Sequence, residues 1–325
     1  MMTRTRHLVT TKDGEQIAVW RVANSIKQHA DATAGAPCAP DTSVKAQNIF
    51  LTHGTFSDKQ TCLKIAEYLA GLGHQCYIME WRGHGDSPAP KEAFDFETVA
   101  TYDYEATFRY FFDELQLNNL HCVTHSGGGV GLTMFLIQYP DYIDKINSAT
   151  MFACQAFGAA ASPISYAKIL AAKLVTKAVG YIPAKKLKLG PINESYHTMN
   201  QWFDWNLQQN FNSSRKQFAD NAPFDYRQHM PMVTMPIYAI SAKGDNFISP
   251  TAGCRRFFDA FNRATNSRPS SAPTSTNNNA TNVFREYARS RGDLDDYTHS
   301  RIMISRHAAT EIWPTVAAWI EQHAR

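Results

Sequence analysis

The chain has 325 residues, of which 44% are hydrophobic and 19% are charged. This composition suits a globular protein with a sizeable core and argues against disorder along most of the length. The 32 Lys and Arg residues barely exceed the 29 Asp and Glu residues, giving a formal net charge of +3, so the strong positive charge of a nucleic-acid-binding chain is absent.

The sequence shows no signal for a membrane span, an export segment or a metal site. No apolar run approaches the ~20 residues that cross a bilayer, so no stable membrane insertion is expected. Residues 1–20 lack the apolar core of a signal peptide, and we expect a cytoplasmic protein. The six cysteines show no CxxC or CxxxH spacing, which argues against a zinc site or a disulfide framework.

Short apolar runs that end at polar or glycine residues predict the strands of a buried sheet. Residues 5–23 predict two strands joined by a polar turn, and residues 24–46 predict a long surface loop. The further strands are expected at 48–52, 76–81, 120–124, 145–154, 235–242 and 283–289.

Helical spacing of apolar residues lies between these strands. Residues 59–71 and 97–115 space apolar side chains at three and four positions, and residues 308–322 do the same at the end of the chain. Alternating strands and helices predict a doubly wound α/β sheet. Residues 263–282, rich in Ser, Thr, Asn and Pro, predict a solvated loop.

The serine after the strand at 120–124 is the strongest candidate for a reacting group. Ser126 lies in the segment THSGG (124–128), between a predicted strand and a glycine-rich predicted helix. A serine on such a sharp bend exposes its hydroxyl, and the N–H of Gly127 points at an oxyanion formed beside it. The usual pattern is GxSxG, and Thr124 replaces its first glycine. The alternative is an ordinary strand–helix turn.

The glycines around this serine could also suggest a dinucleotide-binding turn. A GxGxxG fingerprint that starts at Gly127 requires a glycine where Leu132 stands. The fingerprint therefore fails.

Three more candidates follow predicted strands. Thr55, in His53-Gly54-Thr55-Phe56, could present a second oxyanion N–H, Asp245 follows the strand at 235–242, and His299 follows the strand at 283–289. Taken singly, each has an ordinary alternative as a turn residue, a helix cap or a loop histidine. The order Ser126, Asp245, His299 is typical of an acyl-transfer triad on a doubly wound sheet, whose ligands bind at the edge where parallel strands end.

With these motifs, the sequence resembles the α/β-hydrolase superfamily, closest to its lysophospholipase-like and serine-aminopeptidase-like branch with a helical cap. The resemblance covers about residues 5–25, 47–155 and 233–325. Residues 80–87 (EWRGHGDS) resemble the DxRGxGxS loop of that family, with Glu80 for the aspartate. The block from His299 to Ile320 resembles its terminal histidine–helix segment, which favours His299 over His307 as the base.

The resemblance implies a mostly parallel, eight-stranded sheet with a helical cap inserted after the sixth strand. We expect residues 1–155 and 233–325 to form the core and residues 156–232 to form the cap, or lid. The cap matches no signature that identifies a substrate. Its aromatic cluster predicts either a small core of the cap or an apolar acyl pocket. The cluster consists of Tyr196, Trp202, Phe203, Trp205 and Phe211. We expect Tyr166, Ile169, Leu170 and Leu174 to form one helical face that packs on the core or lines a tunnel.

Six lysines, at 168, 173, 177, 185, 186 and 188, lie in a segment without Asp or Glu from Ile146 to Asn193. A solvated face is the ordinary interpretation of such a segment. The alternative is attraction of an anionic amphiphile or membrane surface.

The combined prediction is a serine hydrolase that acts on carboxylic esters of an apolar acyl or lipid-like substrate. Ser126 is expected to be the nucleophile, His299 the base and Asp245 the group that orients it, with the N–H groups of Thr55 and Gly127 as the oxyanion hole. No metal or organic cofactor is required, and a homodimer is left open. Thioester or amide hydrolysis and acyl transfer remain alternatives on the same triad, with cofactor-free oxidative chemistry a weaker one, and a non-catalytic ligand-binding protein is the alternative from another class.

Candidates for the substrate pocket are Phe56, His125 and Trp202. His125 is a weak candidate, because the neighbour of a nucleophile on a tight turn points elsewhere. His53 is expected to form hydrogen bonds within its own loop.

Overall fold

The computed structural model describes residues 1–24, 45–215, 224–262 and 282–325. The loop predicted at 24–46 and the polar loop predicted at 263–282 lie almost entirely outside the described residues. No helix within the described ranges is long and apolar enough to cross a membrane.

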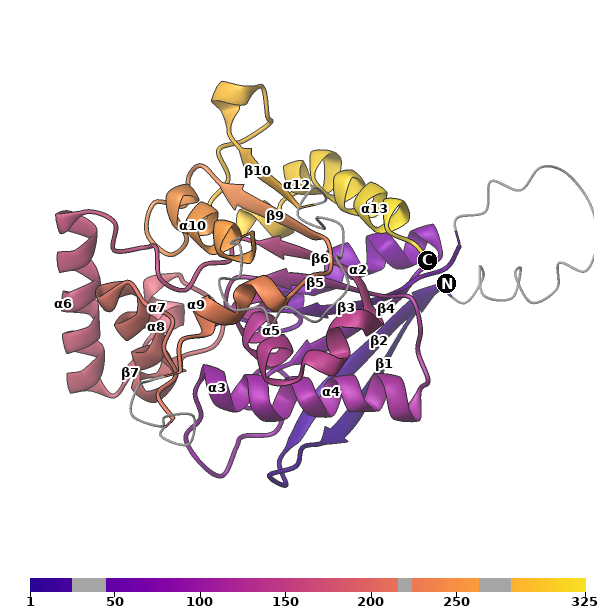
Figure 1. Ribbon diagram of the computed structural model, residues 1–325, viewed down its shortest axis with the longest axis horizontal. Helices are drawn as coiled ribbons and strands as arrows, with labels where there is room; N and C mark the ends of the chain where they lie inside the picture. The colour runs from indigo at the N-terminus through magenta and orange to yellow at the C-terminus, as the bar shows by residue number, and fades with distance from the viewer. Residues whose placement is uncertain (25–44, 216–223, 263–281) are drawn as a thin grey trace, which may run out of the picture.

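Within the described residues, eight strands form one sheet at the centre of the molecule, in the order β1-β2-β4-β3-β5-β6-β9-β10 (Figure 1). The strands are β1 (Met2–Thr10), β2 (Gln16–Asn24), β3 (Asn48–Thr52), β4 (Gln75–Glu80), β5 (Leu120–His125), β6 (Ile146–Phe152), β9 (Ile237–Ala242) and β10 (Val283–Tyr287). β2 runs antiparallel to both of its neighbours, and every other pair is parallel. The predicted mostly parallel, eight-stranded fold is confirmed.

Helices cover both faces of the sheet, and each face has its own apolar core. On one face lie α2 (Gln60–Leu72), α11 (Arg301–Ile304), α12 (Arg306–Glu311) and α13 (Trp313–Gln322). On the other lie α3 (Phe96–Thr98), η1 (Val99–Tyr104), α4 (Glu105–Arg109), η2 (Tyr110–Glu114), α5 (Gly127–Gln138) and α10 (Thr251–Phe261). Short η turns lie at Pro140–Lys145 (η3), Met230–Met232 (η5) and Arg289–Arg291 (η7).

The helix predicted at 308–322 is two helices, α12 and α13. Pro314 lies at the start of α13, where the missing N–H of proline is tolerated, whereas inside one continuous helix it would remove a hydrogen bond.

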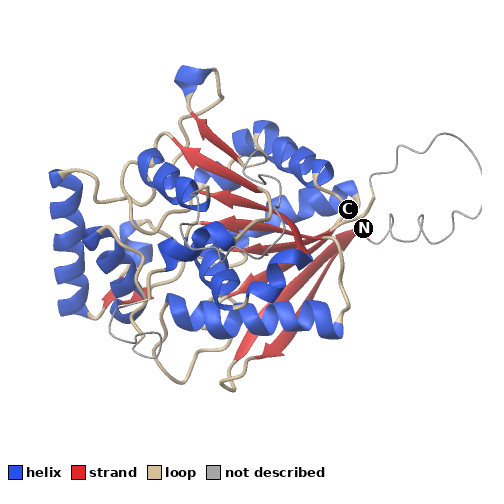
Figure 2. Cartoon of the chain, in the orientation of Figure 1, coloured by secondary structure: helices blue, strands red, loops and turns tan. Residues whose placement is uncertain are grey.

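An inserted segment (residues 156–232) follows β6 and carries helices that lie beyond the ends of the parallel strands (Figure 2). Its elements are α6 (Pro163–Val179), β7 (Tyr181–Ile182), α7 (Ala184–Leu187), β8 (Glu194–Ser195), α8 (Tyr196–Gln208) and α9 (Tyr226–His229). α6 packs against α8 and forms the outer edge of the molecule (Figure 1). Since β9 follows this segment in the sheet, the insertion leaves the order of the core strands intact.

The prediction for the face of α6 is wrong for three of its four residues. Ile169 is fully buried, but Tyr166, Leu170 and Leu174 are exposed. Helical spacing alone cannot tell which side of a helix meets the protein, and α6 contacts its neighbours on only a narrow side.

Candidate active site

Ser126 lies on a strained bend between β5 and α5. Its backbone has φ 54° and ψ −125°, a combination that costs energy for a non-glycine residue and persists only where the surroundings enforce it. Another loop lies close to this bend, since a Cβ on Gly128 would lie 2.6 Å from the carbonyl oxygen of His53. The bend forms although Thr124 replaces the usual glycine, because Gly129 leaves room for the Thr124 side chain.

The three residues predicted as a triad meet within hydrogen-bond distance. Ser126 Oγ donates to His299 Nε2 at 2.8 Å, and His299 Nδ1 donates to Asp245 Oδ2 at 2.6 Å. Asp245 comes from the loop after β9 and His299 from the loop between β10 and α11, so the three side chains converge from distant parts of the sequence. Such a chain of hydrogen bonds can move a proton from a serine hydroxyl to an imidazole.

Asp245 is held in its charged form. Burial alone would raise the pKa of this carboxyl, but the hydrogen bond and electrostatic attraction of the His299 imidazole and the hydrogen bonds of Ser249 lower it well below its usual range. Ser249 Oγ donates to Asp245 Oδ2 at 2.6 Å and lies 2.9 Å from His299 Nδ1. A charged, buried carboxylate with these partners is suited to orient the imidazole and to stabilise its cation.

The two predicted oxyanion donors, Thr55 and Gly127, both line the cavity at Ser126 and come from adjacent loops. A Cβ on Gly54 would lie 2.7 Å from the Gly127 nitrogen and 2.7 Å from Ser126 Cβ, so the loop that carries Thr55 directly abuts the bend. Gly127 is the first residue of α5, where an N–H has no partner inside the helix and the helix dipole favours negative charge. The arrangement can stabilise a negative oxygen beside Ser126.

Two histidines near the site are neutral and form hydrogen bonds with the backbone. Burial, with the electrostatic influence of the nearby His299 ring adding to it, lowers the pKa of His125 to about 3. Its Nε2 donates to the carbonyl oxygen of His299 at 2.9 Å, and its ring lies 4.8 Å from the His299 ring, centre to centre. His125 is therefore not among the residues that line the cavity but supports the loop of His299. His53 Nδ1 donates to the Gly54 carbonyl at 2.7 Å, within its own loop.

Residues of the inserted segment form hydrogen bonds with the backbone of Phe56, the residue after Thr55. Phe56 has φ 65°, its N–H donates to Glu194 Oε1 at 3.0 Å, and its carbonyl accepts from the N–H of Ile192 at 3.2 Å. Glu194 Oε1 also lies 2.7 Å from His84 Nε2, and both of these side chains are 2% exposed. The position of the Thr55 loop thus depends on a buried carboxylate from a different part of the chain.

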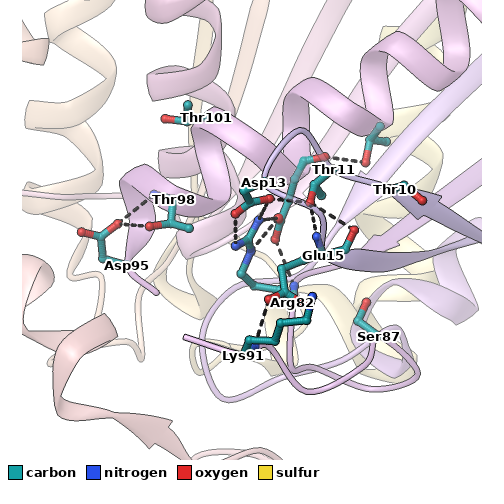
Figure 3. Close-up of polar contacts among 12 residues, drawn as sticks. Thr10, Thr11, Asp13, Glu15, Arg82, Ser87, Lys91, Asp95, Thr98 and Thr101 are labelled. Carbon is teal, nitrogen blue, oxygen red and sulfur yellow. Dashed lines mark hydrogen bonds and ion pairs between the residues drawn. The ribbon is translucent and has the colours of Figure 1, made fainter. Parts of the chain in front are cut away.

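The loop that resembles DxRGxGxS is a structural support. Arg82 donates to Asp13 at 2.7 Å (Figure 3) and to Asp103 at 2.8 Å. The carboxylate of Glu80 is fully buried and accepts from the N–H of Asp86 at 3.0 Å, and a Cβ on Gly85 would overlap it. These contacts fix the loop that presents His84 to Glu194.

An apolar cavity of about 520 Å³ reaches Ser126. It is bounded by Thr55, Phe56 and Gly127 at the triad end and by residues of the inserted segment elsewhere, among them Ile182, Met199, Trp202 and Phe203. The aromatic cluster divides between the two predicted roles: Trp202 and Phe203 line the cavity, whereas Trp205 packs on Phe96 and Phe211. The volume of the cavity is within the range of small-molecule binding sites.

Sequence reasoning missed two residues, Ser249 and Glu194. No sequence signal marks Ser249, since a hydroxyl four positions after an acid is ordinary. Glu194 does have a signal, as the first acidic residue after Asp144: an isolated carboxylate among lysines and apolar residues could have been considered a buried partner.

Comparison with known proteins agrees with this architecture. Residues 48–163 match the profile of a family described as alpha/beta hydrolase fold. No curated protein matches the chain.

Similar solved structures extend over the whole chain. An esterase from Exiguobacterium antarcticum has 13% identity and a TM-score of 0.58, covering 98% of this chain and 100% of its own. A Pyrococcus furiosus esterase has 10% identity and a TM-score of 0.60, covering 100% and 92%. The structure of DcsB with its substrate analogue has 13% identity and a TM-score of 0.62, covering 99% of both.

These comparisons do not distinguish the lysophospholipase-like branch, which stays a prediction. Together with the strand order and the bend at Ser126, the match over residues 48–163 and the similar structures show that the chain has the α/β-hydrolase fold.

Proposed function

We propose that the protein is a serine hydrolase that cleaves carboxylic esters with an apolar acyl group. The observation that carries this proposal is the contact between Ser126 Oγ and His299 Nε2 at 2.8 Å, backed by Asp245, at one end of an apolar cavity. Similar structures are named as esterases, which agrees with ester chemistry without identifying the substrate.

In the proposed mechanism, Ser126 Oγ attacks the ester carbonyl while His299 Nε2 takes the hydroxyl proton. The negative oxygen that forms is bound by the N–H groups of Thr55 and Gly127, and each such donor is worth ~10²–10³ in turnover. His299 then gives the proton to the departing alkoxide, which leaves as an alcohol. A water molecule, deprotonated by the same nitrogen, hydrolyses the acyl-enzyme and restores Ser126.

The inserted segment is proposed to act as a lid that holds the apolar part of the substrate. Its side chains form most of the cavity wall, and they leave few polar groups to hydrate an acyl chain. An acyl group in this cavity would be removed from water, which favours binding roughly in proportion to the apolar area buried.

Labelling with a fluorophosphonate tests the nucleophile. The wild-type protein should be labelled at Ser126 and Ser126→Ala should not, because the probe needs an activated hydroxyl. Labelling of Ser126→Ala at another serine, or none of the wild type, would refute the assignment.

Substrate panels test the reaction. p-Nitrophenyl esters of increasing chain length should show a burst of one equivalent of product, which a non-catalytic binding protein does not give. Faster cleavage of aminoacyl anilides or thioesters than of the matched esters would favour amide or thioester hydrolysis, and ester formation with an added alcohol would favour acyl transfer.

A further inference from the structure

The outer side of α6 is an exposed apolar face. In this 17-residue helix only Ile169 and Thr176 are buried. At about 100° per residue, the side opposite these two residues holds Ile164, Ala167, Ala171, Leu174, Val175 and Ala178. Ile164 is 70% exposed, Leu174 58% and Val175 63%. Single exposed apolar residues are ordinary, but a continuous apolar face indicates a binding surface.

Lysines border this face. Lys168 and Lys177 are separated by about 900° of helical turn, so they lie roughly 180° apart around the axis, one at each border of the apolar face. Lys185, Lys186 and Lys188 follow in and after α7, and all five are exposed. Of the six lysines in this stretch, only Lys173 forms an ion pair among the described residues, with Asp204.

The cavity opens into the same surface. Val175, Val179, Tyr181 and Leu187 line the cavity that reaches Ser126, yet each of them is between 42% and 63% exposed. Leu187 lies between Lys186 and Lys188 in sequence. The exposed apolar side chains, the lysines and the mouth of the cavity therefore form one region, which we call the α6 surface (Ile164, Lys168, Leu174, Val175, Lys177, Val179, Tyr181 and residues 185–188).

We propose that the α6 surface docks on an anionic lipid surface, so that an apolar ester passes from the lipid into the cavity without crossing water. A helix with an apolar face and lysines along its borders lies at a lipid interface with the apolar side inward and the ammonium groups at the headgroups. Anionic lipid supplies the opposite charge that these lysines do not find among the described residues. Docking does not require catalysis; only the delivery of substrate rests on the proposed hydrolase function.

Two other binding partners of the α6 surface, a second copy of the chain and another protein, fit these observations less well. A second copy related by twofold symmetry would place this surface against itself. Lysines would then face lysines, with no acid from Ile146 to Asn193 to pair with them. A protein partner seated on the α6 surface would cover the mouth of the cavity, whereas a lipid surface can supply the substrate through it.

Vesicle flotation of the Ser126→Ala protein tests docking without turnover. The expected result is binding to vesicles of equal parts phosphatidylcholine and phosphatidylglycerol, little binding to phosphatidylcholine alone, and weaker binding as salt rises. Each of Lys168→Gln and Lys177→Gln should weaken binding about fivefold. Ile164→Gln with Leu174→Gln should weaken it further by removing apolar contact. Matched controls are Lys64→Gln on α2 and Leu8→Gln on β1, an exposed lysine and an exposed leucine elsewhere, which should not change binding.

Equal binding to both vesicle types, no binding to either, or equal loss in the control variants would overturn the proposal. So would a dimer that becomes monomeric in the Ile164→Gln, Leu174→Gln protein, because a second copy would then cover the α6 surface. In otherwise wild-type protein, these two changes should spare a soluble short-chain p-nitrophenyl ester and slow cleavage of a vesicle-held ester. If neither ester is cleaved, the hydrolase proposal fails. The flotation experiment still tests docking, because it does not depend on turnover.

Discussion

Replacing Glu194 by alanine is expected to slow ester hydrolysis mainly through kcat. Glu194 Oε1 accepts from the Phe56 N–H at 3.0 Å and contacts His84 Nε2 at 2.7 Å, with the carboxylate almost fully buried. Loss of this acceptor leaves the Phe56 N–H unpaired and releases one restraint on Thr55. Complete loss of an oxyanion donor costs ~10²–10³ in turnover, so partial displacement of Thr55 should lower kcat by about 10- to 100-fold.

The stability cost of the same change is large enough to measure separately. Breaking a buried charge pair by removing one partner costs about 3–5 kcal/mol. Activity should therefore be assayed under conditions where the variant is shown to be folded by circular dichroism and denaturant titration. Glu194→Gln keeps an oxygen that can accept from Phe56, so it should lose less kcat than Glu194→Ala.

Glu97→Gln is the matched control. Glu97 is also a buried carboxylate that joins the core to the inserted segment, accepting from Tyr226 at 2.8 Å and from Gln201 at 2.8 Å, but it does not contact the Thr55 loop. The Glu97→Gln substitution should reduce the stability of the protein and leave kcat nearly unchanged. If Glu194→Ala keeps wild-type kcat, or if Glu97→Gln loses as much kcat, the role of Glu194 in positioning the oxyanion loop is refuted.

The contact between His84 and Glu194 also predicts how the stability of the protein depends on pH. Burial lowers the pKa of His84, but the charge and hydrogen bond of Glu194 outweigh it, and the net pKa is raised. A group with a raised pKa in the folded state contributes stability that is complete below its unfolded value, about 6.5 for histidine, and that is lost as pH rises through the folded value. The wild type should lose this contribution with rising pH, and Glu194→Ala should show a flatter profile in denaturant titrations.

Two further substitutions test the triad and the bend. Asp245→Asn should lower kcat by ~10⁴, because an amide no longer selects the tautomer of His299 or stabilises its cation; a loss of less than tenfold in steady-state assays would contradict this role. Gly129→Ala should cost about 1–3 kcal/mol, because the new methyl group overlaps Cys154 Sγ. Adding Cys154→Ala should restore part of that stability in denaturant titrations, and a double variant no more stable than the single one would show that the strain lies elsewhere.

The strands and the candidate triad could be predicted because their signals are local. The apolar runs at 48–52 and 120–124 match β3 and β5 almost residue for residue, since a buried parallel strand needs a short, continuous apolar run. Ser126, Asp245 and His299 each follow a strand of one sheet, so chain order and strand ends together predict a meeting point. The structure brings the three together at hydrogen-bond distance.

Other features depended on contacts that no local pattern encodes. Periodicity predicts that α6 has an apolar side, but exposure of Leu174 depends on which side meets α8. The direction of His125 depends on the bend at Ser126, which turns the imidazole toward the His299 loop and away from the cavity.

By itself, the sequence determined the fold class and the candidate reacting groups. The spacing of apolar residues, the positions of glycines and the order of the candidate residues along the chain are properties of the sequence alone. Only the tertiary structure decided that Glu194 holds Phe56, that Ser249 supports Asp245 and that exposed residues of α6 and α7 line the cavity. Each of these depends on how distant segments pack, because burial and partner choice are set by the neighbours that folding brings together.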